Sequence, residues 1–221
     1  MRASVDRYLD PYLDPASRLG EILFGLIMAL GFTGAVRLGL EEADNQALLI
    51  GILGCNVAWA IVDGVMYVLT ALFERGRKTR LARDVRAAPG EAAALQLIAS
   101  EYDDRLETLL TPEERAQIYR SVLAAVRRVQ LPPPHVHRED LVGGVAVALV
   151  ILVATLPIVV PYLVVSDPDL AVRLSNGIAL TLLFVLGAWW GQVVGGRALR
   201  IATGLTLLGV TLVLITIALG G

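Results

Sequence analysis

Hydrophobic residues in this chain are gathered into long blocks, and polar segments separate the blocks from one another. A helix needs about 20 mostly apolar residues to cross a lipid bilayer. Five blocks meet that requirement, and they cover residues 19–38, 47–73, 141–165, 174–194 and 199–219. The sequence therefore predicts five transmembrane helices. The second block is longer than the hydrocarbon layer requires, so its helix is expected to tilt or to continue into water past Glu74.

The polar segment 74–140 carries the spacing of short amphipathic helices. Apolar residues recur there at intervals of three and four, which places on one helical face Leu95, Ile98, Tyr102, Leu106 and Leu109. A second helix is expected to begin at the sequence TPEER, where Thr111 and Glu114 have the spacing of a capping box. Two short helices bury too little apolar area to be stable alone. They are expected to pack on each other, on the extended end of the second helix, or on a second subunit.

This pattern indicates an all-α, polytopic membrane protein with five transmembrane helices and a small helical cytoplasmic insert between helices two and three. We predict an N-terminal cytoplasmic segment at 1–18, transmembrane helices one and two at 19–73, the insert at 74–140, and transmembrane helices three to five at 141–221. Composition agrees with this division, because 56% of the 221 residues are hydrophobic and 18% are charged. In soluble domains, about 45–50% of the residues are apolar and about 25% are charged on average.

The distribution of Lys and Arg predicts the orientation, because cytoplasmic segments carry an excess of both. The N-terminal segment holds three arginines, whereas the loop 37–46 holds one arginine against three acidic residues. The insert opens with the basic run ERGRKTRLARDVR. The N-terminus and the insert are therefore predicted to be cytoplasmic and the C-terminus to lie outside. Short loops and a compact length favour a bacterial inner membrane, with membrane lipid as a partner.

Several classes of protein are disfavoured. A single cysteine, Cys55, excludes an internal disulfide framework. The first 20 residues are too acidic and too poor in apolar residues for a secretory signal peptide. A net charge of −2 without a strongly basic domain argues against a nucleic-acid partner. Phosphate-binding loops, metalloprotease helices and nucleophile elbows have no match, so neither enzyme activity nor a tightly bound cofactor is expected.

Asp63 is the most informative residue, because it lies near the middle of the second apolar block. An ionised Asp at the centre of a membrane helix costs about 2.5–3.5 kcal/mol on insertion scales, so it requires a partner or a role. Asn56 lies seven residues earlier on the same helix face, and Met66 lies one turn away. Oxygen and thioether ligands suit a borderline divalent ion such as iron(II). The alternative is that Asp63 hydrogen-bonds neighbouring helices and only fixes their packing.

The first apolar block offers a second pair of candidate ligands. Glu21 and Met28 are seven residues apart and share a helix face, and together with Asn56, Asp63 and Met66 they would supply oxygen and thioether ligands to one ion. Glu21 and Glu74 are both expected near the cytoplasmic ends of their helices, where they would form an ion entrance. Alternatively, each is simply solvated, and Glu21 interacts favourably with the dipole of the first helical turn.

The insert holds an acidic group that includes Glu101, Asp103, Asp104 and Glu107. Spacings of three and four let pairs of these carboxylates converge on a divalent cation. The alternative, which we favour, is a solvated face paired with Arg105, Arg115 and Arg120.

Two histidines precede the third apolar block in the sequence HVHRED. His135 and His137 alternate along an extended segment and could chelate a transition metal, but a third ligand is not evident. An interfacial loop is the preferred interpretation. A membrane-bound metallohydrolase built on this sequence is the least favoured function.

Three stretches carry a resemblance to a known family. LGEILFGLIMALGFTGAV in the first block, AIVDGVMYVLTALFERG in the second and LPIVVPYL in the third resemble the corresponding spans of the vacuolar iron transporter family. The resemblance covers most of the chain from about Arg18 onward. It implies a homodimeric exchanger that moves iron(II) or manganese(II) out of the cytoplasm against protons. It also implies that carboxylates and methionines of the first two spans line the ion path, and that glutamates of the cytoplasmic helices collect metal.

The chain departs from that family at the residues that matter most. The family has an Asp-Gly pair in its first span, where this chain has Met28 within GLIMA. The family has Met-Gly in its second span, where this chain has Asp63-Gly64. The acid and the thioether have therefore exchanged helices. Asn56 is the polar residue nearest to the position of the family's second-span glutamate, and the insert holds fewer glutamates than the family's.

These observations predict a transporter of iron(II) or manganese(II) that exchanges metal for protons. The alternative is a membrane sensor or assembly protein that retains the scaffold and does not transport.

Overall fold

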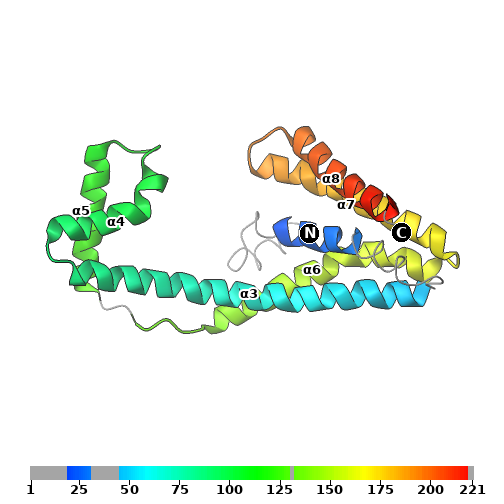
Figure 1. Ribbon diagram of the computed structural model, residues 1–221, viewed down its shortest axis with the longest axis horizontal. Helices are drawn as coiled ribbons and strands as arrows, with labels where there is room; N and C mark the ends of the chain where they lie inside the picture. The colour runs from blue at the N-terminus through cyan, green and yellow to red at the C-terminus, as the bar shows by residue number, and fades with distance from the viewer. Residues whose placement is uncertain (1–18, 31–44, 130–131, 219–221) are drawn as a thin grey trace, which may run out of the picture. The chain divides into compact units, whose positions relative to one another are not determined.

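The computed structural model describes residues 19–30, 45–129 and 132–218 (Figure 1). All regular secondary structure in these ranges is helical, which confirms the all-α prediction. The helices are Leu19–Leu30, α3 (Asn45–Ala87), α4 (Glu91–Leu106), α5 (Pro112–Arg128), α6 (Arg138–Val164), α7 (Pro168–Val193) and α8 (Ala198–Ala218).

Four of the described helices are long and apolar enough to cross a membrane, namely α3, α6, α7 and α8. They correspond to the predicted second to fifth spans. The chain is thus a membrane-embedded, all-helical protein. The first predicted span is helical over Leu19–Leu30. Its remaining residues, 31–38, and the predicted N-terminal segment 1–18 lie outside the described residues.

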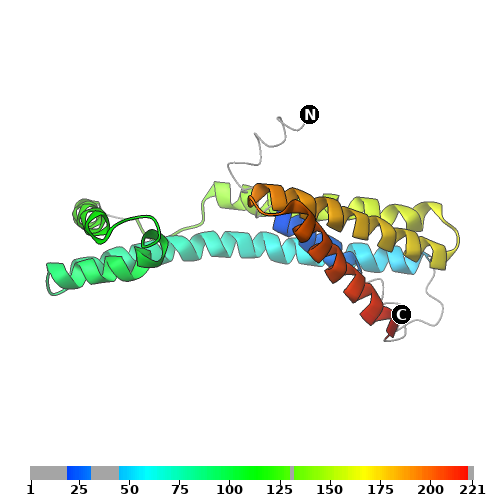
Figure 2. The ribbon, with the colours of Figure 1, turned by 90° about the horizontal axis from the view of Figure 1, so that it is seen from above.

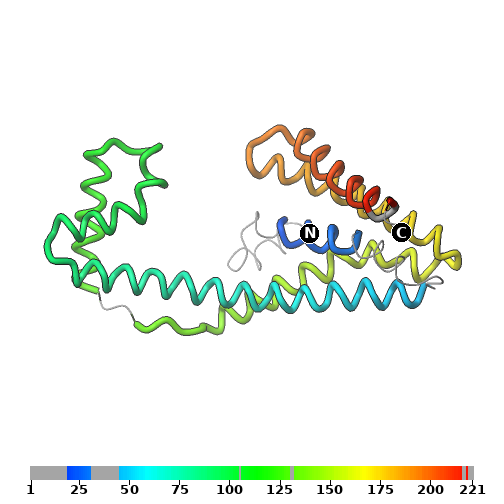
Figure 3. The backbone as a smooth tube through the Cα atoms, in the orientation of Figure 1, coloured from blue at the N-terminus to red at the C-terminus, as the bar shows by residue number. Residues whose placement is uncertain are grey.

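Helix α3 continues well beyond the apolar block. It is a single helix of 43 residues, and Figure 3 shows its backbone continuing without interruption from cyan into green. The prediction that the second helix continues past Glu74 is confirmed.

Helix α7 begins six residues before the predicted span. The Asp167 side chain accepts hydrogen bonds from the backbone N–H groups of Asp169 at 2.9 Å and Leu170 at 3.4 Å, and Pro168 occupies the first turn. This N-cap satisfies donors that a helix start leaves unpaired. The helix therefore starts at polar residues that a search for apolar blocks leaves out.

The chain forms two compact units, and residues 1–68 and 138–221 make up the first. Its hydrophobic core joins the Leu19–Leu30 helix to α3, α6 and α7. The fully buried side chains that meet there include Leu26, Leu30, Ile52, Ile158 and Leu183. Large apolar residues on the outer faces of α3, α6, α7 and α8 are exposed, as lipid-facing residues are.

Helix α6 stays helical through two prolines, Pro157 and Pro161. Prolines are tolerated in membrane helices when neighbouring groups satisfy the backbone. The buried Ser175 hydroxyl of α7 donates to the Ile158 carbonyl of α6 at 2.9 Å. Figure 2 shows α6 and α7 joined by a short turn and running side by side.

Residues 69–137 make up the second unit, in which α4 and α5 pack on each other and on the last turns of α3. Its buried core consists of Val85, Ala94, Ile98, Tyr119 and Leu123. The predicted capping box is present, because the Thr111 N–H donates to Glu114 at 2.8 Å and the Thr111 hydroxyl accepts from the Glu114 N–H. Two of the three packing partners expected for these helices are therefore confirmed. The third, a second subunit, stays a prediction.

A polar contact ties α4 to α5. The Tyr119 hydroxyl donates to the Asp103 carboxylate at 2.7 Å, and the Arg115 guanidinium pairs with the same oxygen. The hydrogen bond from Tyr119 and the charge of Arg115 lower the pKa of Asp103 below its ordinary value of 3.8.

We expect this contact to weaken in acid. A carboxylate with a lowered pKa stabilises the fold above its ordinary pKa, and that stabilisation is lost as pH falls through the lowered value. Hydrogen-exchange protection of α4 and α5 amides in the full-length protein should therefore fall as pH decreases below 3.8. Asp103→Asn should reduce protection already at neutral pH and flatten the pH dependence. Identical protection in the two proteins at neutral pH would contradict this role.

Candidate functional site

Two carboxylates from different helices lie near each other in the first unit. Asp63 lies on α3 and Glu21 on the Leu19–Leu30 helix, and both side chains are half-buried. The two groups lie close enough for their negative charges to interact. No described Lys or Arg forms an ion pair with either of them. Two uncompensated carboxylates that repel each other are stabilised by a divalent cation or by a shared proton.

The fold brings these acids together because both of their helices pack closely against α6. Gly64, which follows Asp63, lies so near α6 that a Cβ atom there would be 2.7 Å from the Gly144 carbonyl oxygen. Gly25 lies one turn beyond Glu21, and a Cβ atom there would be 3.3 Å from the Ile151 carbonyl oxygen. Small residues at such contacts let helix backbones approach each other. Helix α6 thus fixes the register of both acid-bearing helices.

Asn56 places a buried amide oxygen on α3, the helix that carries Asp63. Its side chain is fully buried, and its amide nitrogen donates to the Ile52 carbonyl of the preceding turn at 2.9 Å. Its amide oxygen has no hydrogen-bond partner among the described residues. An unpaired polar atom in an apolar interior is unfavourable, and amide oxygens are ligands for divalent cations. Asn56 lies two turns before Asp63 on α3.

The two methionines differ in their surroundings. Met28 is half-buried on the Leu19–Leu30 helix, two turns after Glu21. Met66 lies on an outer face of α3 and is 52% exposed in the single chain. Each methionine therefore shares a helix with one of the acids, but Met28 is partly buried in the single chain and Met66 is exposed on its surface.

The remaining predicted acids lie in the second unit, and two of them share one arginine. Arg77 pairs with Glu74 at 3.3 Å and with Glu101 at 3.1 Å. Asp103 is bound by Arg115 and Tyr119. Of the arginines that the sequence suggested as partners, Arg115 forms an ion pair. Arg77 was not among the suggested partners.

Asp104 and Glu107 form no ion pair with the described residues. Across the described part of the chain, no three His, Cys, Asp or Glu side chains are grouped closely enough to hold a metal ion.

The two histidines lie in contact with each other. The rings of His135 and His137 meet edge to face with centroids 4.4 Å apart, and Nδ1 of His135 lies 3.1 Å from the Pro133 carbonyl oxygen. No third ligand joins them among the described residues. The geometry is that of a loop packed on itself.

The sequence suggested two roles for Glu21, one in a ligand set with Asp63 and one with Glu74 at an ion entrance. The structure brings Glu21 near Asp63, whereas Glu74 pairs with Arg77. Gly64 directly follows Asp63, and Gly25 lies one turn from Glu21. Because these glycines mark the helix faces that pack against α6, they are the sequence signal that the two acids lie near each other.

Comparison of the chain with models of known protein families and with curated proteins gives no match.

Proposed function

We propose that the protein transports a divalent metal ion, iron(II) or manganese(II), across a membrane, with Glu21 and Asp63 as the central ion-binding pair. The observation that carries this proposal is the proximity of two carboxylates on two apolar helices without a basic partner among the described residues. Placing a charged side chain in a membrane helix costs free energy. Two like charges cost more, unless a cation binds between them.

The neighbouring groups support a metal as that cation. The unpaired amide oxygen of Asn56 lies on the same helix as Asp63, and the thioether of Met28 lies on the same helix as Glu21. Carboxylate and amide oxygens bind hard divalent ions, and a thioether adds selectivity for softer ones such as iron(II). When the metal leaves, the same carboxylates can take up a proton, which would couple export of metal to import of protons.

The proposal includes a topology. The Leu19–Leu30 helix with residues 31–38 forms the first of five spans, and α3, α6, α7 and α8 form the others. The N-terminus and residues 74–140 lie in the cytoplasm, the C-terminus lies outside, and two copies assemble as a homodimer in a bacterial inner membrane. The basic run after the apolar part of α3 supports this orientation. The outer face of α3, with exposed Val62, Met66 and Leu69, is apolar enough for lipid or a second copy.

Flux measured in proteoliposomes tests the proposal. The full-length protein is reconstituted with a metal-quenched dye inside the vesicles, and manganese(II) or iron(II) is added outside. We expect dye quenching faster than in protein-free vesicles, and acceleration by a proton gradient of opposite direction. Metal binding without flux would instead favour the sensor or assembly protein.

A further inference from the structure

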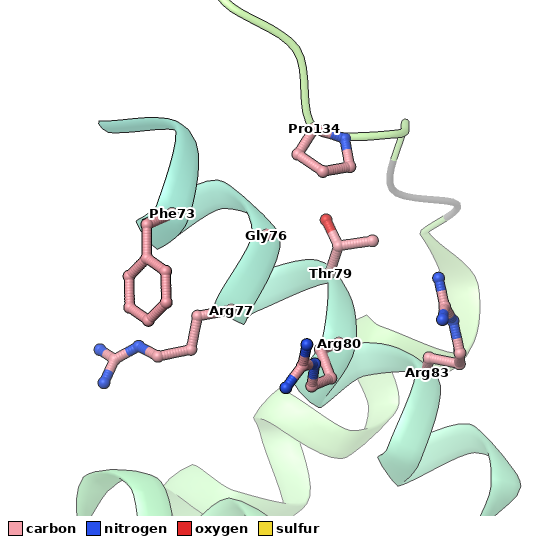
Figure 4. Close-up of a pocket in the computed structure, with 7 residues that line it drawn as sticks. All are labelled: Phe73, Gly76, Arg77, Thr79, Arg80, Arg83 and Pro134. Atoms are coloured by element: carbon pink, nitrogen blue, oxygen red, sulfur yellow. The ribbon is translucent and has the colours of Figure 1, made fainter. Parts of the chain in front are cut away.

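The last part of α3 carries a basic hollow that metal transport does not use. The hollow has a volume of about 300 Å³ and lies wholly within the second unit. Figure 4 shows its lining, in which arginines project from successive turns of α3 and Pro134 faces the Thr79 side of the helix. The lining residues are Phe73, Gly76, Arg77, Thr79, Arg80, Arg83 and Pro134. Three of the seven are arginines and none is acidic.

The charge available in the hollow comes from two of the arginines. Arg77 is already paired with Glu74 and Glu101. Arg80 and Arg83 are exposed and form no ion pair with any described acidic residue. The Thr79 hydroxyl donates to the Arg75 carbonyl at 2.9 Å, so its proton is not directed at a ligand. Arg80 and Arg83 lie one turn apart on α3 and both line the hollow. A guanidinium group without a counter-charge donates paired hydrogen bonds to a phosphate group.

The position of the hollow along α3 indicates where that phosphate group comes from. The apolar block of α3 ends at Phe73, which lines the hollow and is 68% exposed. At 1.5 Å per residue, Arg77, Arg80 and Arg83 follow Phe73 by about 6, 10 and 15 Å along the helix axis. The headgroup layer extends about 5–8 Å beyond the hydrocarbon on each side. Long arginine side chains can reach back into that layer.

We propose that this hollow binds the phosphate group of an anionic phospholipid, with Arg80 and Arg83 as the phosphate ligands and Phe73 in contact with the acyl region. A polybasic segment directly after a membrane helix attracts anionic lipid. The hollow adds a defined place where one headgroup can bind. The proposal does not depend on metal transport.

Binding to the full-length protein in a neutral detergent tests the proposal. Isothermal titration is carried out with dihexanoyl phosphatidylglycerol, dihexanoyl phosphatidylcholine and inorganic phosphate, all without metal. We expect phosphatidylglycerol to bind at one site and the zwitterionic lipid to bind at least about tenfold more weakly. Inorganic phosphate should bind more weakly than phosphatidylglycerol, because it makes no contact with Phe73.

Two matched double variants distinguish binding in the hollow from a general effect of positive charge. The double variant Arg80→Gln/Arg83→Gln should weaken phosphatidylglycerol binding at least about tenfold. The control Arg120→Gln/Arg127→Gln removes the same charge from exposed positions on α5 and should change it less than about twofold. Helical circular dichroism should be the same in both variants, because all four side chains are exposed.

Two results would overturn the proposal. Equal losses of phosphatidylglycerol affinity in the two double variants would show that only net charge matters. Inorganic phosphate that binds as tightly as phosphatidylglycerol, with Phe73→Ala affecting neither, would identify free phosphate as the ligand and reject the lipid. We expect Phe73→Ala to weaken the binding of phosphatidylglycerol and to leave the binding of inorganic phosphate unchanged.

Discussion

Asp63→Asn is expected to lower metal flux into proteoliposomes by about 100-fold or more. Even the loss of a group that only supports a metal ligand reduces metal affinity by about 10–100-fold, and Asn keeps the size of Asp63 while removing its charge. Glu21→Gln should lower flux in the same way. Because the proposal places the two carboxylates in one site, the double variant should be scarcely worse than either single variant.

The matched control is Asp84→Asn, which removes one carboxylate from an exposed position of the same helix. Its flux should stay within about twofold of the unmodified protein, since an exposed charge contributes little. Unmodified flux in Asp63→Asn, with protein yield and oligomeric state unchanged, would show that this residue only fixes helix packing.

Gly64→Ala is expected to destabilise the protein and to lower flux, although it touches neither carboxylate. The added Cβ atom would lie 2.7 Å from the Gly144 carbonyl oxygen, so α3 and α6 must separate. Overpacking of a tight contact typically costs about 1–3 kcal/mol. The measurement is the thermal unfolding midpoint in detergent, followed by tryptophan fluorescence, together with the flux assay.

Gly54→Ala on the same helix provides the control, because no atom of another described helix lies within 4 Å of a Cβ atom at that position. It should leave stability unchanged or raise it by up to about 1 kcal/mol, since Ala favours a helix more than Gly does. Equal midpoints and fluxes for the two alanine variants would contradict a close contact between α3 and α6.

The membrane helices could be predicted from the sequence because their length and apolarity are local properties. The blocks at 141–165 and 199–219 match α6 and α8 closely. The start of α7 was missed, because its N-cap at Asp167 and Pro168 lies in a polar turn outside the apolar block. The capping box at Thr111 and Glu114 was predictable, because it depends on residues three apart.

Contacts between helices were much harder to predict, since they depend on register and rotation. The pairing of Arg77 with Glu101, which are 24 positions apart, requires α4 to fold back on α3, and no periodicity encodes that. The proximity of Glu21 and Asp63 depends on how the glycine faces of two helices meet α6. The sequence grouped Asp63 and Glu21 among the candidate ligands of one ion, but it could not show which faces of their helices meet.

The most direct test of the proposed ion site at Glu21 and Asp63 is a structure of the full-length protein soaked with manganese(II) and measured for anomalous scattering. We expect an anomalous peak between the carboxylates of Glu21 and Asp63, within bonding distance of both. A soaked structure that has no peak there, and in which both carboxylates are hydrogen-bonded to protein groups in a dry helix contact, would contradict an ion site at this position.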